Sequence, residues 1–140
     1  MKGSLLDTNL LLALAWPNHQ HHAPAHQWFS SHHRKGWATC ALTELGFVRL
    51  SANPAFTSCA VSPSEAATLL QRWTRHAGHQ FWESSPADAP AIYARAIGHQ
   101  QVNDAWLVDL ARRHSGRLVT FDSRIAVHAA TVGIVDVIRT

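Results

Sequence analysis

The sequence predicts an α/β fold with a mostly parallel sheet that carries helices on both faces. Short apolar segments alternate along the chain with longer segments whose apolar residues recur at helical spacing, which is typical of βαβ units. The length of 140 residues is close to the commonest size of one domain, so a single domain over residues 1–140 is expected. A hydrophobic content of 46%, with six tryptophans, excludes a disordered chain.

The N-terminal segment predicts a strand followed by a helix. Residues 2–6 form a short apolar run that stops at Asp7, as a buried strand would. The pair at 8–9 predicts a polar turn, and the leucines from Leu10 onward predict a helix that Pro17 ends.

Glycine and proline separate the next elements. A second helix is expected over 25–33, and Gly36 precedes an apolar segment at 37–40 that has the length of a buried strand. Apolar residues at helical spacing over 42–50 predict a further helix, which stops before the Asn-Pro pair at 53–54.

Ser62 marks the beginning of another helix. It forms a capping-box pattern with Glu65, Pro63 occupies the first helical position, and Gly78 closes the segment. The remaining expected elements are strands over 79–83, 117–121 and 134–138, and helices over 86–97, 103–116 and 125–130.

The expected cellular location depends on two kinds of segment, a membrane span and a secretory signal. The longest strictly apolar run, from Leu10 to Trp16, has seven residues, against about 20 for a membrane span. Asp7 interrupts the segment that would form a secretory signal, so we expect a cytoplasmic protein without a membrane partner. Cys40 and Cys59 have no metal-ligand spacing and are expected to be reduced.

Four of the nine acidic residues stand where predicted strands end or the neighbouring helices begin. Ligands of open α/β sheets bind at the carboxyl ends of the strands, so these acids are candidates for one site. Their mutual repulsion requires a cation, and oxygen-only ligands favour Mg²⁺ or Mn²⁺, which can activate water for phosphodiester hydrolysis. The four acids are Asp7 after the first strand, Glu44 in the helix after the second, Asp104 before strand 117–121, and Asp122 after it.

Each of these acids also has a purely structural interpretation. Asp7, Asp104 and Asp122 have the residue type and position of helix caps, and Glu44 in a first turn complements the helix dipole. The occurrence of all four at such positions favours a shared site.

Three segments, in order and spacing, resemble one family. LLDTNLLLAL, the step Thr43-Glu44-Leu45 and QVNDAWLVDLARRHSGRLVTFD are similar to PIN-domain ribonucleases, specifically the VapC toxins of bacterial toxin–antitoxin pairs. The resemblance covers nearly the whole chain. It implies a three-layer αβα sandwich and a metal-dependent endoribonuclease that uses Mg²⁺ or Mn²⁺.

The resemblance also assigns residues and partners. Asp7, Glu44, Asp104 and Asp122 correspond to the family's catalytic, metal-binding acidic quartet, with Asn9 and Thr120 as polar neighbours. The family usually has threonine before the third acid, whereas this chain has Asn103, which changes a neighbour and keeps the acid. The implied partners are an RNA substrate, a cognate antitoxin and a second copy of the chain in a homodimer.

Other classes use similar features. A receiver-like signalling domain needs a lysine at a late strand end, and the only lysines are Lys2 and Lys35. A phosphatase of the haloacid-dehalogenase type needs a second aspartate two residues after the first, where this chain has Asn9. A non-catalytic RNA- or protein-binding module, whose acids act only as caps, remains the alternative, and metal-dependent RNA cleavage discriminates between the two.

Several further residues have two readings. His22 and His26 stand four apart, at a spacing that suits Zn²⁺, although no acid or cysteine completes a ligand set. The arginine-rich net charge of +3 is compatible with nucleic acid, and the cluster of arginines at 112, 113 and 117 either grips phosphate or ends a solvated helix.

The first helix is unusually rich in leucine, at positions 10, 11, 12 and 14. Such a helix either forms an apolar groove for an antitoxin helix, with Trp16 and Trp28 as anchors, or is buried between the sheet and its neighbours.

Overall fold

The structure of the protein is a computed structural model that describes residues 3–84, 89–127 and 133–140. Its centre is a five-stranded sheet in which every neighbouring pair is parallel, in the order β3-β2-β1-β4-β5. This confirms the predicted parallel sheet. The strands are β1 (Ser4–Leu6), β2 (Trp37–Thr39), β3 (His79–Phe81), β4 (Arg117–Thr120) and β5 (Val135–Val137).

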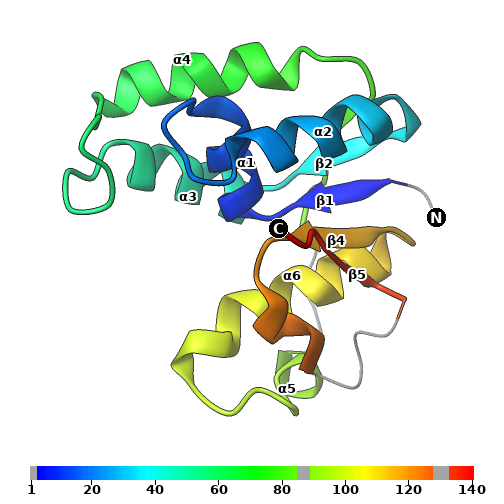
Figure 1. The fold of residues 1–140 in the computed structure, drawn as a ribbon. Helices are drawn as coiled ribbons and strands as arrows, with labels where there is room; N and C mark the ends of the chain where they lie inside the picture. The colour runs from blue at the N-terminus through cyan, green and yellow to red at the C-terminus, as the bar shows by residue number, and fades with distance from the viewer. Residues whose placement is uncertain (1–2, 85–88, 128–132) are drawn as a thin grey trace.

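Helices cover both faces of the sheet, which gives three layers (Figure 1). Helices α1 to α4 lie on one face, and α5 and α6 lie on the other, so the expected αβα sandwich is confirmed. No helix in the described parts of the chain is long and apolar enough to cross a membrane. The helices are α1 (Thr8–Ala15), α2 (His22–His32), α3 (Ala41–Ser51), α4 (Pro63–Thr74), α5 (Ala89–Ile92) and α6 (Val102–Arg113), with 3₁₀ segments η1 (His33–Lys35), η2 (His99–Gln101) and η3 (Ser123–Val127).

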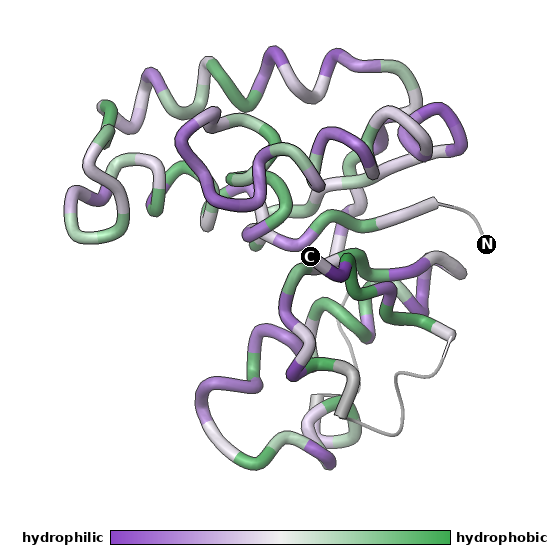
Figure 2. The backbone as a smooth tube through the Cα atoms, viewed as in Figure 1, coloured by the Kyte–Doolittle hydropathy of each residue, from purple (hydrophilic) through white to green (hydrophobic). Residues whose placement is uncertain are grey.

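The central strand is apolar on both faces because both faces are covered. Successive residues of a strand point to opposite sides, and Leu5 joins the core cluster around α6 while Leu6 joins the cluster around α1. Figure 2 shows the matching helix patterns: α1 is hydrophobic along most of its length, whereas α4 alternates between hydrophobic and hydrophilic residues. Helix α4 therefore buries one side, at Ala66 and Leu70, and exposes the other.

Helix α1 is a core element. Its leucines at 10, 11, 12 and 14 are each at most 3% exposed. The interpretation of this helix as an open leucine groove is therefore wrong, and the buried alternative is confirmed. Trp28 is also buried, and the indole Nε1 of Trp16 donates to Ser51 Oγ at 2.9 Å.

Two predicted boundaries shifted for local reasons. The pair at 8–9 is the first turn of α1 and not a separate turn, because Asp7 caps the helix directly: its Oδ1 accepts from the Thr8 N–H at 2.8 Å. The expected helix over 86–97 is reduced to α5 in its described part, and Ile97 beyond it is 89% exposed. A short helix needs an apolar face packed against the rest of the molecule, and this segment lacks one at Ile97.

The C-terminal elements also differ from the prediction. The helix expected over 125–130 is the 3₁₀ segment η3 as far as residue 127, and residues 128–130 lie outside the described part. Helix α4 begins at Pro63 after Ser62, as predicted, but ends at Thr74, before Gly78.

The paired histidines of α2 hold the end of α1. His22 Nδ1 donates to the Ala13 carbonyl at 2.7 Å, and His26 Nε2 donates to the Leu14 carbonyl at 2.9 Å. The last carbonyls of a helix lack partners within the helix, and these two rings supply them. These two hydrogen bonds give the pair a structural role at the end of α1.

The strand order reverses direction around β1. The chain runs from β1 outward through β2 to β3 and then crosses to β4 on the other side of β1. The crevice at the carboxyl ends of β1 and β4 is the position where open α/β sheets bind ligands. Asp7 follows β1 and Asp122 follows β4, so both stand at this crevice.

Candidate active site

Asp7 is a buried carboxylate held from two sides. It is 9% exposed, Oδ1 accepts from the Thr8 N–H, and Oδ2 accepts from Thr120 Oγ1 at 2.7 Å. Burial raises the pKa of Asp7, the two hydrogen bonds act in the opposite direction, and the negative charge of Asp122 adds to the rise. The ionised form of Asp7 is therefore destabilised by its surroundings and would be favoured by a cation beside it.

Thr120 is the centre of the hydrogen-bond network around Asp7. Its fully buried hydroxyl donates to Asp7 and accepts from Asn9 Nδ2 at 3.1 Å and from the Asp122 N–H at 3.0 Å. Asn9 Oδ1 in turn accepts from the Phe121 N–H at 3.3 Å. The structure thus places Asn9 and Thr120 beside Asp7, and the network fixes the end of β4 against the start of α1.

Asp122 is bound to an arginine of its own loop. Arg124 donates from Nε to Oδ1 at 2.9 Å and from Nη2 to Oδ2 at 2.8 Å, and its backbone N–H also donates to Oδ1 at 3.0 Å. These bonds lower the pKa of Asp122. Asp104, in the first turn of α6, lies close enough that its charge also raises the pKa of Arg124. Arg124 therefore connects two of the predicted site acids.

Glu44 has different neighbours. Thr39 Oγ1 donates to Glu44 Oε2 at 2.6 Å, and because that hydroxyl proton is used, His79 Nε2 donates to Thr39 Oγ1 at 2.8 Å. Gly46, two residues further along α3, is the residue that faces the start of α1: a Cβ added there would lie 2.9 Å from Thr8 Oγ1. Two residues correspond to about 200° around a helix, so Glu44 points to the opposite side of α3.

The structure therefore brings Asp7 and Asp122 together and places Asp104 beside the arginine that binds Asp122. The contact described for Glu44 is with Thr39, and the assignment of Glu44 to the quartet stays a prediction. Within residues 3–84, 89–127 and 133–140, no group of three or more His, Cys, Asp or Glu side chains is arranged to hold a metal ion. The donor chemistry still fits a hard divalent cation, because Asp7 is a buried carboxylate next to a second carboxylate.

Sequence reasoning missed Arg124, Thr39 and His79. Arg124 stands two residues after an acid at a strand end, and that short spacing was the available signal for an ion pair. The contact between Thr39 and His79 joins residues 40 positions apart and depends on the pairing of β2 with β3. Of the arginines considered for phosphate, Arg113 pairs with Asp109 at 2.8 Å and Arg117 with Asp136 at 3.7 Å.

Comparison with known proteins identifies the family. The model of the PIN domain matches residues 4–130. Ribonuclease VapC39 of Mycobacterium tuberculosis is 43% identical, over 96% of this chain and 99% of its own length. Ribonuclease VapC38 of the same organism is 44% identical over 87% and 86% of the two chains, and ribonuclease VapC44 is 41% identical over 90% of each. The chain therefore belongs to the PIN domain family, as a relative of the VapC ribonucleases.

Proposed function

We propose that the protein is a metal-dependent endoribonuclease that hydrolyses RNA phosphodiester bonds as the toxin of a toxin–antitoxin pair. The observation that carries the proposal is the buried carboxylate of Asp7, which lies beside Asp122 at the crevice between β1 and β4 and would be stabilised by a cation. The chain is also related, over nearly its full length, to proteins named ribonucleases. A module that only bound RNA or protein would be capped equally well by a neutral asparagine at this position, without a charge that burial destabilises.

Asp7, Asp104 and Asp122 are the residues that would hold Mg²⁺ or Mn²⁺, and Glu44 is the fourth acid expected from the sequence. A bound divalent cation supplies a water molecule of lowered pKa and a positive charge beside the phosphate. The chain's own contribution is orientation. Thr8 and Thr120 fix the two oxygens of Asp7, and Asn9 fixes Thr120, so the carboxylate cannot rotate away.

RNA cleavage by the purified protein tests the proposal. We expect cleavage in Mg²⁺ or Mn²⁺, none in excess EDTA, and none from Asp7→Asn. Asp136→Asn is the matched control, because Asp136 lies on β5 in a surface ion pair with Arg117. Cleavage that continues in EDTA, or an Asp7→Asn variant that cleaves like the parent, contradicts the proposal.

A cognate antitoxin and a homodimer are proposed on the same basis of relatedness. The supporting surface lies between α3 and α4, where a cavity of about 600 Å³ is bordered by two exposed apolar side chains, Leu45 at 69% and Phe81 at 47%. Co-expression with the reading frame upstream, followed by copurification and growth measurements, tests both. Growth arrest that is equal with and without that partner, together with elution as a monomer, contradicts them.

A further inference from the structure

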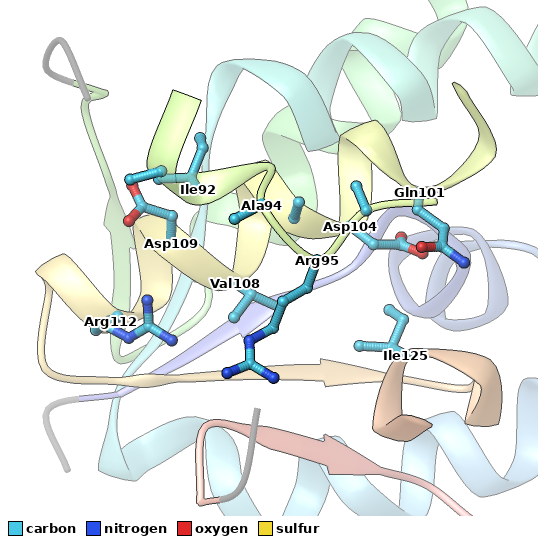
Figure 3. A pocket seen from close by; sticks show the side chains of 12 residues that line it. Ile92, Ala94, Arg95, Gln101, Asp104, Val108, Asp109, Arg112 and Ile125 are labelled. Carbon is cyan, nitrogen blue, oxygen red and sulfur yellow. The ribbon is translucent and has the colours of Figure 1, made fainter. Parts of the chain in front are cut away.

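A second cavity lies alongside α6 and has one of the predicted site acids, Asp104, in its lining. It has a volume of about 110 Å³ and lies between α6, α5 and η3. Figure 3 shows Asp104 and Gln101 at one end beside Ile125, and Asp109 and Arg112 at the other end. The cavity therefore shares Asp104 with the proposed active site.

The walls of this cavity combine apolar and charged side chains. Ile92, Val108 and Ile125 give it an apolar lining, and the last two are 7% and 1% exposed, so this part is fixed by the core. Arg95 lies across the middle of the cavity in Figure 3 and is exposed. Arg95 and Arg112 are the positive side chains of the lining, and Asp104 and Asp109 are the negative ones, of which Asp109 pairs with Arg113.

We propose that this cavity receives the base of the nucleoside next to the cleaved phosphate and so determines which RNA sequence is cut. The inference rests on the proposed function. With the scissile phosphate at Asp104, a neighbouring base is the part of the substrate that reaches this cavity.

The chemistry of the lining selects a base over other ligands. An anion is disfavoured because Asp104 lines the same cavity, and a purely apolar ligand would make no use of the guanidinium of Arg95. A nucleobase is neutral and flat, stacks on guanidinium planes and apolar side chains, and offers hydrogen-bonding edges. A volume of about 110 Å³ is well below the range of pockets for larger ligands, which suits one base.

The experiment compares the sequences cut in an RNA pool of randomised sequence. Two substitutions change the lining of the cavity directly. Ala94→Trp fills the cavity from an exposed position, and Arg95→Gln removes a guanidinium. Ala55→Trp, in the exposed turn after α3, and Arg75→Gln, at the end of α4, are matched controls on the opposite layer. Thermal unfolding checks that all four variants are folded.

For the parent protein we expect a preference of about tenfold for one base at one position beside the cleaved bond. Ala94→Trp and Arg95→Gln should lose this preference at that position while still cleaving RNA, and the two controls should keep it. Cleavage by the parent without any base preference beside the cut, or a preference that both cavity variants retain, overturns the cavity as a base site and leaves the nuclease standing. A parent that cleaves no RNA in Mg²⁺ or Mn²⁺ overturns the proposed function itself.

Discussion

Asp7 acts both as the cap of α1 and as the most buried acid of the site. Because burial raises its pKa, its ionised form costs stability at neutral pH when no cation is bound. Asparagine caps a helix about as well as aspartate and carries no charge. We therefore expect Asp7→Asn to unfold at a higher urea concentration than the parent at pH 7 in EDTA.

The same measurement in Mn²⁺ provides the contrast. The cation should stabilise the parent and leave Asp7→Asn nearly unaffected, because binding to the folded state alone raises stability. Asp136→Asn, on the surface, should respond to Mn²⁺ as the parent does. An Asp7→Asn variant that is less stable than the parent in EDTA would show that the ionised carboxylate does not destabilise the folded protein.

Arg124 pairs with Asp122 through two parallel hydrogen bonds. A divalent cation that uses Asp122 competes with this guanidinium. We expect Arg124→Gln to bind Mn²⁺ a few-fold more tightly by calorimetric titration. Arg117→Gln, which removes a longer ion pair with Asp136 at 3.7 Å, should leave the affinity unchanged. Equal Mn²⁺ affinities of Arg124→Gln and the parent would mean that Arg124 does not compete.

At the scale of elements, the contact between α1 and α3 depends on the absence of a side chain at Gly46. A Cβ there would lie 2.9 Å from Thr8 Oγ1 and 3.0 Å from Thr8 Cγ2. Gly46→Ala should therefore lower the free energy of unfolding by about 1–3 kcal/mol through overpacking, despite the better helix propensity of alanine.

Thr8→Ala removes Oγ1 and Cγ2, the two atoms that a Cβ at position 46 would meet, and so provides a second variant for this test. In the double variant Thr8→Ala/Gly46→Ala, most of the loss should be recovered, so the two changes are not additive in urea unfolding. If the double variant is as unstable as the sum of the single variants, the two helices do not meet at this pair.

The elements that sequence reasoning placed well are those with strong local signals. Ser62 and Pro63 mark the start of α4 because capping chemistry acts within one turn of the chain. Helix α5 was overextended because periodicity alone does not tell whether a partner surface exists for Ile97. The orientation of Glu44 could not be predicted from the sequence either, because the direction in which a side chain leaves a helix depends on how the whole helix packs.

At the scale of the whole molecule, alternation of strands and helices predicted a parallel sheet, but not the order of its strands. That order determines which acids meet. The approach of Asp7 to Asp122 follows from the pairing of β1 with β4, and no local signal within either segment specifies it. The resemblance to a family assigned both acids to one quartet at the sequence level, without giving the strand order.

The pH dependence of folding should reflect two half-buried histidines in separate parts of the molecule. Burial lowers the pKa of His19, before α2, and of His79, on β3, below the ordinary value of 6.5. The unfolded chain then takes up protons more readily than the folded one, so stability is present above pH 6.5 and is lost as the pH falls below it.

Urea unfolding between about pH 7 and pH 5 measures this loss. His79→Gln should flatten the dependence, because glutamine keeps a donor for Thr39 and does not titrate in this range. His99→Gln, at an exposed position, should have the same pH dependence as the parent. A His79→Gln curve parallel to that of the parent would contradict the role of His79.

The bond between Thr120 and Asp7 joins residues 113 positions apart. During synthesis the chain emerges from its N-terminus, so β1 and Asp7 leave the ribosome long before β4 exists to pack beside them. A nascent chain therefore carries an incomplete acid cluster for most of its translation. Asp7 can therefore meet Asp122 only late in synthesis, after β4 has been made.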